Sequence, residues 1–223
     1  MGIKENLESI RKQMGQAAAK SGRRTEAIVL VGVSKNFSSQ QINEALACGL
    51  RDIGENRVQE AEIKFPCIAH ARKHFVGHLQ GNKVKKAVEI FDIIQSVDSL
   101  KIAEKISNAA LEQERKMPVL IQIKTDEKKH FGIRPEEAEE FLRTAAQLEG
   151  ICIHGLMTIG PEFEKAEASR PVFRQMKKLF GALHEKKIPR IEMRYLSMGM
   201  SSDFAIAIEE GANMVRIGRA LFG

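Results

Sequence analysis

The sequence of 223 residues contains no tryptophan, one tyrosine and three cysteines. Few aromatic side chains leave few platforms on which the bases of single-stranded nucleic acid could stack. Cys48, Cys67 and Cys152 lie far apart without a CxxC pair, which argues against a disulfide framework and against a sulfur-rich metal site. We therefore expect no nucleic-acid partner and no metal, and the reducing cytoplasm is the natural compartment.

The sequence also lacks an apolar run long enough to span a bilayer, and its N-terminal residues lack the apolar stretch of a signal peptide. We expect a soluble protein without membrane contact. The net charge is +6, and much of the excess lies in lysine-rich pieces such as 83–86 and 177–178. Because these pieces lie on segments with amphipathic patterning, solvated helix faces explain them better than a nucleic-acid surface does.

Short runs rich in β-branched residues alternate with amphipathic segments, which is typical of βα units around a parallel sheet buried on both faces. The length and the 43% hydrophobic content fit one domain, which we place at residues 1–223. Eight strands that each feed a helix favour an α/β fold closed into a (β/α)₈ TIM barrel over an open sheet. The strands are expected at 28–34, 52–54, 74–79, 93–97, 118–123, 152–157, 195–198 and 214–217.

Helices are expected between these strands, with an extra N-terminal helix at about 3–20. Ser38 and Ser99 have the residue type and position of N-caps, and Gly49 and Gly211 of C-terminal stops. The helices between strands are expected near 38–48, 57–64, 82–89, 99–115, 135–148, 165–186 and 203–210.

Candidate functional residues lie just after the strands, because the active sites of (β/α)₈ barrels form at the carboxyl ends of the strands. Lys35 closes the first apolar run. A lysine with an apolar strand behind it can be desolvated and become a nucleophilic amine, although a solvated or anion-binding lysine is the more common case. This residue alone therefore leaves both interpretations open.

The last two βα units contain a candidate phosphate site. The turn at 199–203, which contains Ser201, offers free backbone N–H groups to an anion. Gly218 closes the eighth strand and lets the backbone approach a ligand closely. Loops after strands seven and eight are the recurrent phosphate site of this fold. Asp203 would repel a phosphate, so we interpret it as a helix cap or first-turn residue.

Six segments in this order resemble the pyridoxal phosphate homeostasis protein family, the YggS/PROSC-type proteins related to the barrel domain of alanine racemase. The resemblance spans nearly the whole chain, and the ordered set is far more specific than any one segment. The segments are VGVSK at 31–35, GENRVQE at 54–60, HFVGHLQGNK at 74–83, HGLMT at 154–158, LSMGMS at 196–201 and VRIG at 215–218.

The resemblance implies a pyridoxal 5′-phosphate (PLP) cofactor held as a Schiff base on Lys35. It also implies that Ser201, with the backbone around Gly218 and position 219, binds the phosphate, and that Arg216 faces the pyridine nitrogen. An arginine there keeps the nitrogen unprotonated and weakens the cofactor as an electron sink. Asn56 is expected beside the ring, with His78 and Met157 lining the pocket.

One position departs from the family pattern. Arg219 stands where a serine or threonine commonly follows the glycine of the last strand. The backbone N–H of Arg219 can still reach a phosphate, but the hydroxyl contact is lost and a charged group is available instead.

We expect a carrier that stores or delivers PLP, with PLP-dependent apoenzymes as its recipients, and not an enzyme. Racemisation of the alanine racemase type needs a tyrosine acid opposite the lysine, supplied by a second domain, whereas this sequence stops at Gly223, directly after the eighth unit. The one tyrosine, Tyr195, is expected in packing at the far end of the barrel. Without a second domain we expect a monomer.

Two other functions stay open. The first is a weak PLP-dependent racemase or lyase, and the second is a basic barrel that binds nucleic acid or protein without the cofactor.

Two further sets of residues each have an ordinary structural explanation. His70, His74 and His78 are spaced by four, but on a strand that spacing separates them by about 13 Å, too far for one metal ion. Glu55 is a base by type, but an ion pair with Arg57 or a lysine is the more common fate.

Overall fold

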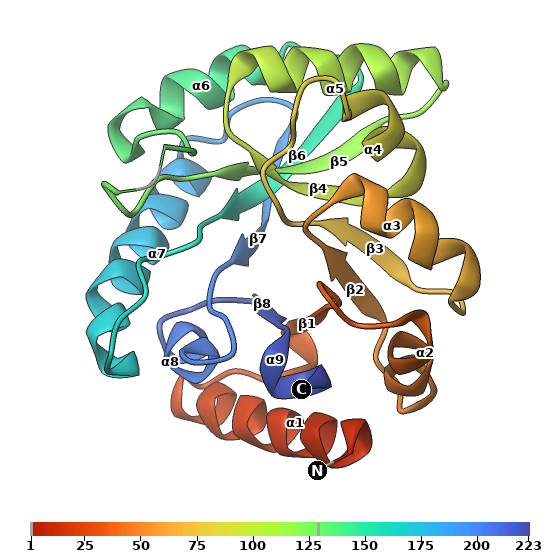
Figure 1. Cartoon of the computed structure of the whole chain (residues 1–223). Helices are drawn as coiled ribbons and strands as arrows, with labels where there is room; N and C mark the ends of the chain where they lie inside the picture. The colour runs from red at the N-terminus through yellow and green to blue at the C-terminus, as the bar shows by residue number, and fades with distance from the viewer. Residues whose placement is uncertain (1, 129) are drawn as a thin grey trace.

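The chain forms a closed barrel of eight parallel strands surrounded by helices, as the sequence predicts (Figure 1). The computed structural model describes residues 2–128 and 130–223. Strand β1 pairs with both β2 and β8, which closes the sheet on itself. The strands are β1 (Val29–Val33), β2 (Asp52–Glu55), β3 (Arg72–Phe75), β4 (Ile93–Val97), β5 (Met117–Gln122), β6 (Ile151–Met157), β7 (Ile191–Ser197) and β8 (Met214–Ile217).

The helices lie outside the strands, and α1 forms the expected addition before the first strand (Figure 1). Across the described part of the chain, none of the helices has the length and apolarity needed to cross a membrane. The α-helices are α1 (Ile3–Lys20), α2 (Ser39–Ala47), α3 (Val58–Lys64), α4 (Val84–Ile90), α5 (Leu100–Glu112), α6 (Ala138–Ala145), α7 (Arg170–Glu185), α8 (Phe204–Glu209) and α9 (Arg219–Phe222). Short 3₁₀ helices occupy Thr25–Ala27, Phe65–Cys67, Pro135–Glu137 and Ala166–Ser169.

The predicted helix boundaries are confirmed where capping residues mark them. The hydroxyl oxygens of Ser38 and Ser99 accept backbone N–H groups in the first turns of α2 and α5, at 3.2 and 3.4 Å. Gly49 and Gly211 follow α2 and α8 with φ of +87° and +103°. Only glycine adopts this conformation freely, and so these residues end the two helices.

Two strands, β3 and β7, differ from the prediction by more than one residue at an end. Strand β3 was expected at 74–79 but ends at Phe75. Beyond it the backbone at Gly77 passes so close to Asn56 that a Cβ would lie 2.1 Å from the Asn56 carbonyl oxygen, so the chain leaves the sheet there. Strand β7 was expected to begin at Tyr195 but begins at Ile191, where alternating exposed residues hide its apolar pattern.

The apolar core has two layers. The outer layer fills the space between the strands and the helices. The inner layer fills the barrel itself, as in other packed (β/α)₈ barrels. Tyr195 belongs to this inner layer and is 5% exposed, so the expectation of a packing role is confirmed. The buried residues of the inner layer are Val31, Ile93, Leu120, Met157, Tyr195 and Met214.

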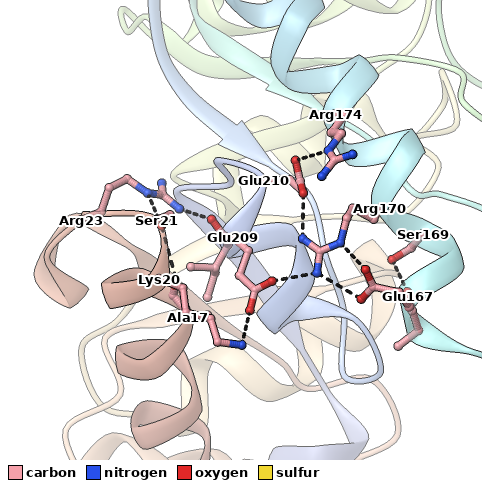
Figure 2. A network of polar contacts seen from close by, with 12 residues as sticks. Ala17, Lys20, Ser21, Arg23, Glu167, Ser169, Arg170, Arg174, Glu209 and Glu210 are labelled. Carbon is pink, nitrogen blue, oxygen red and sulfur yellow. Dashed lines mark hydrogen bonds and ion pairs between the residues drawn. The ribbon is translucent and has the colours of Figure 1, made fainter.

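A network of ion pairs fastens α1 to α7 and α8 (Figure 2). Arg170 of α7 contacts Glu209 and Glu210 at 2.8 and 2.7 Å. Lys20 of α1 contacts Glu209 at 2.8 Å, and Arg174 contacts Glu210 at 3.0 Å. Because Arg170 and both carboxylates are largely shielded from water, the network ties the first helix to the last βα units more firmly than isolated surface pairs would.

Candidate functional site

Lys35 lies directly after β1, at the carboxyl end of the barrel. Its side chain is exposed, and its ammonium makes no hydrogen bond or ion pair with another described residue. The next residue, Asn36, has a φ of +66°, which marks a tight turn at this point. The chain therefore offers a free amine at the mouth of the barrel.

A buried carboxylate supports the segment that carries Lys35. Glu55, at the end of β2, is fully buried and accepts hydrogen bonds from the Ser34 hydroxyl at 2.8 Å and the Asn56 backbone N–H at 3.1 Å. The Lys64 ammonium contacts Glu55 at 2.6 Å and the Ser34 carbonyl oxygen at 2.9 Å. The expected ion pair of Glu55 is thus made with a lysine, while Arg57 pairs with Glu60.

Arg216 of β8 is buried inside the barrel, with 4% of the residue exposed. Its guanidinium donates to the Ser197 hydroxyl at 2.6 Å and to the Thr158 carbonyl oxygen at 2.7 Å. These contacts use two of its five N–H bonds and leave the others for a ligand. Burial lowers the pKa of Arg216 to about 10, against the attraction of Asp203, so the group remains a cation at neutral pH.

The loops after β7 and β8 present a group of unused backbone donors. Within the described chain, the N–H groups of Ser201, Ser202, Gly218 and Arg219 have no acceptor, and the Ser201 hydroxyl oxygen accepts the Ala220 N–H at 3.4 Å. A buried or ligand-facing N–H needs a partner, and an anion can supply one. The two loops therefore have the donors that a phosphate group requires.

The two charged residues of these loops lie in different surroundings. Asp203 precedes α8, and its carboxylate accepts the Met200 N–H at 2.6 Å, which confirms its expected place at the start of the helix. Burial raises the pKa of Asp203. The Arg219 guanidinium is exposed and contacts no acceptor among the described residues, so the charge at this position is free to meet a ligand or solvent.

The register of the barrel brings Lys35, Arg216 and Gly218 to neighbouring strand ends. Val31 pairs with Arg216 and Gly32 with Ile217, so the residues after each strand follow side by side. A Cβ at Gly218 would lie 3.2 Å from the Val33 carbonyl oxygen, which shows how closely the two strand ends approach.

The remaining expected pocket residues lie further round the barrel mouth. Asn56 and His78 line a cavity of about 570 Å³ that Lys35 does not line. The His78 ring stacks on Phe131 with centroids 3.6 Å apart and contacts Asp98 at 3.0 Å. Met157 is fully buried in the inner layer of the barrel. Asn56 and His78 thus follow the carboxyl ends of β2 and β3, the end of the barrel that carries Lys35, whereas Met157 lies within the barrel.

The three histidines at spacing four lie in separate surroundings. The expected strand at 74–79 would contain His74 and His78. Since β3 covers only Arg72–Phe75, it contains His74, whereas His70 and His78 lie outside it. His74 is fully buried, and its burial lowers its pKa despite the neighbouring Asp52 carboxylate. Within residues 2–128 and 130–223, no three histidine, cysteine or acidic side chains are grouped as metal ligands would be.

The sequence prediction missed the polar side chains inside the barrel, namely Gln95, Ser197 and the buried His74. All three lie within strands and are completely buried. The available signal was polarity in the middle of apolar runs, as at Gln95 between Ile94 and Val97. Such a side chain has to find a partner within the barrel, because burying it without one is unfavourable.

The chain matches the family model described as the alanine racemase N-terminal domain over residues 3–223. It is 36% identical to the pyridoxal phosphate homeostasis protein of Aquifex aeolicus, covering 100% of this chain and 98% of the relative. It is 38% identical to the protein of the same name from Escherichia coli K12, covering 99% and 96% of the two chains.

Solved structures show the same fold. PipY of Synechococcus elongatus PCC7942, with PLP bound, superposes with a TM-score of 0.88 at 37% identity, covering 99% of this chain and 100% of PipY. An alanine racemase from Clostridium difficile superposes with a TM-score of 0.75 at 17% identity, and the match covers 100% of this chain and 56% of the racemase. At this lower identity the likeness concerns the fold alone.

Proposed function

Because the chain belongs to the pyridoxal phosphate homeostasis protein family, we propose that it binds PLP and stores or delivers this cofactor within the cell. Its relatives carry that name, and PipY was solved with PLP bound. The proposal covers one domain spanning residues 1–223.

The observation that carries the proposal is the meeting of three complementary groups at adjacent strand ends. Lys35 offers an unpaired amine for the aldehyde of PLP, and the loops containing Ser201, Gly218 and Arg219 offer unused N–H donors for its phosphate. Arg216 is a buried cation with N–H bonds to spare for the ring nitrogen. The residues present therefore fit the cofactor, with Asn56 at the rim.

Arg216 suits storage better than turnover. When bound, PLP supplies an electron sink for amino-acid chemistry. A cation beside the ring nitrogen disfavours protonation of that nitrogen, because two adjacent positive charges repel. Arg216 would therefore keep the cofactor in its weaker electronic form.

The position of Tyr195 also supports a role without catalysis. Its hydroxyl oxygen accepts a hydrogen bond from Arg72, the first residue of β3, at 3.2 Å. This contact lies at the amino end of the strands, opposite the end that carries Lys35. Tyr195 is therefore unable to act as the acid facing Lys35 that two-sided proton transfer requires.

The proposal includes PLP-dependent apoenzymes as recipients, a monomeric carrier and a cytoplasmic location. Cys48, Cys67 and Cys152 are free thiols, which suits a reducing compartment.

An absorption spectrum of the protein with added PLP, before and after borohydride, tests the proposal. We expect a Schiff-base band in the wild type that borohydride bleaches, and its loss in Lys35→Ala. Lys85→Ala is the matched control, because Lys85 is an exposed lysine paired with Glu112 on the outer surface, and it should keep the band. No band in the wild type would reject the cofactor assignment and favour a barrel that binds protein or nucleic acid.

An assay for amino-acid racemisation separates a carrier from an enzyme. We expect no turnover above the rate of free PLP. Robust racemisation that Lys35→Ala abolishes would show instead that the protein is a racemase.

A further inference from the structure

A line of hydrogen bonds crosses the interior of the barrel and ends on Arg216. The Asp52 carboxylate contacts His74 Nε2 at 2.9 Å, and His74 Nδ1 contacts Gln95 Nε2 at 2.8 Å. Gln95 Oε1 accepts the Ser197 hydroxyl at 2.6 Å, and Ser197 Oγ accepts from Arg216 at 2.6 Å. The five side chains come from β2, β3, β4, β7 and β8, so only the closed barrel brings them together.

Arg216 determines the direction of every hydrogen bond in this line. A guanidinium only donates hydrogen bonds, so the Ser197 oxygen accepts from it and the Ser197 hydroxyl donates its own hydrogen bond to Gln95 Oε1. The Gln95 amide then presents its NH₂ group to His74 Nδ1, which has to be the unprotonated nitrogen. The opposite amide orientation would place two donors on Ser197 and leave the hydroxyl proton without an acceptor. His74 is therefore neutral, with its proton on Nε2 and directed at Asp52.

Burying this line of polar side chains lowers the stability of the fold, and the position of the line suggests why it is present. An apolar filling such as that of Val31, Ile93 and Leu120 would stabilise the barrel interior without buried polar groups. The line instead places three fully buried polar side chains behind one arginine. The Arg216 guanidinium has one other hydrogen-bond partner in the described chain, the Thr158 carbonyl oxygen, so Ser197 accepts one of the two hydrogen bonds that hold it.

We propose that His74, Gln95 and Ser197 are positioning residues that orient Arg216 toward the ring nitrogen of the cofactor. The inference rests on the proposed binding of PLP. Asp52 holds the far end of the line and, through the fixed chain of dipoles, favours the charged form of Arg216. Asp203, from the loop after β7, also attracts the guanidinium. The line thus keeps a cation in place beside the ring at a buried position where charge is unfavourable.

Ser197→Ala and Gln95→Leu each interrupt the line. Ser107→Ala is the matched control, because Ser107 is also a buried serine whose hydroxyl oxygen accepts a hydrogen bond, from the Gly150 N–H at 2.9 Å, but it lies on α5 away from Arg216. We expect both line variants to weaken PLP binding about tenfold, the equivalent of one lost hydrogen bond, while the control keeps the wild-type affinity.

The protonation of the cofactor provides a measurement that a loss of stability alone would not change. With PLP labelled with ¹⁵N at the ring nitrogen, NMR should show that atom unprotonated in the wild type and in Ser107→Ala. In Ser197→Ala a misplaced guanidinium should allow the nitrogen to take up a proton. An unprotonated nitrogen with unchanged affinity in both line variants would overturn the proposal.

A second NMR measurement tests the line without the cofactor. The ¹⁵N signals of His74 in cofactor-free protein should show a proton on Nε2 alone. Gln95→Glu places a carboxylate at Nδ1, so His74 should become doubly protonated between two acids. A proton on Nδ1 in the wild type would overturn the hydrogen-bond direction. If the wild type shows this His74 signal but does not bind PLP, the proposed function fails and the positioning role fails with it. If the wild type binds PLP and the line variants bind it with the same affinity and the same unprotonated ring nitrogen, only the positioning role is rejected.

Discussion

The ion pair beneath Lys35 allows a sharp test of how buried charge supports the barrel mouth. Lys64→Met keeps the length of the side chain and removes its charge. Glu55 is fully buried, and only 15% of the Lys64 side chain is exposed. The substitution leaves the Glu55 carboxylate with the Ser34 and Asn56 hydrogen bonds but without a countercharge.

The expected loss follows from this burial. Removing one partner of a buried pair costs about 3–5 kcal/mol, and the partial exposure of Lys64 places the value near the lower end, at about 3 kcal/mol. For a chain of this size such a change lowers the melting temperature by roughly 6–12 °C. Glu55→Leu combined with Lys64→Met should be more stable than Lys64→Met alone, because the unpaired charge is gone.

Urea unfolding and thermal melts, both followed by circular dichroism, measure the differences in unfolding free energy and in melting temperature. Lys86→Met is the control, because Lys86 makes two ion pairs, with Glu62 and Glu89, on the surface. We expect its melting temperature to be unchanged. If Lys64→Met melted within about 2 °C of the wild type, or if the double variant were the least stable of the set, the reasoning about an uncompensated buried carboxylate would be wrong.

Three further predictions follow from other contacts. Arg170→Ala should lower the unfolding free energy by about 1 kcal/mol, since solvent screens part of its pairing with Glu209, and added salt should narrow the difference in thermal melts. Burial lowers the pKa of His74, although the Asp52 carboxylate opposes the shift, so below about pH 6.5 the unfolded chain binds more protons than the folded chain. The unfolding free energy should therefore fall as the pH drops, by at most about 1.4 kcal/mol per pH unit. His74→Phe should lose this pH dependence when unfolding is measured by urea titration. Gly155→Ala should leave most of the protein insoluble on expression, because φ is +134° and a Cβ would lie 2.0 Å from the Tyr195 carbonyl oxygen.

The barrel could be predicted because its strands are marked by local composition. Strands β4 and β8 have the predicted ends, since each lies between clear turn signals and is mostly apolar, although Gln95 and Ser96 interrupt β4 and Arg216 interrupts β8. Strand β3 was displaced because it begins with Arg72 and Lys73, while the apolar residues after it belong to a loop. The close approach of Gly77 to Asn56 that ends this strand is a tertiary contact, which no local pattern reveals.

The site could be predicted as far as its residues lie in short continuous segments. Lys35, Ser201 and Gly218 follow strands and could be found by position. The partners of Arg216 could not, because Ser197 ends β7 and Thr158 directly follows β6, and both meet Arg216 only when the barrel closes. In buried parallel strands both faces are apolar, so the alternation that would show which residues point inward is missing.

Helix α1 has a consequence for how the chain acquires its structure during synthesis. It packs on α8 and α9, and its Asn6 side chain donates to the Leu221 carbonyl oxygen, 215 residues away. The apolar face of α1 therefore emerges from the ribosome long before its partners exist. At a typical synthesis rate of 5–20 residues per second, about 10–40 s pass between the synthesis of α1 and that of its packing partners. During that interval the helix is an exposed amphipathic segment, a natural target for chaperones, and the barrel can close only after translation has passed β8.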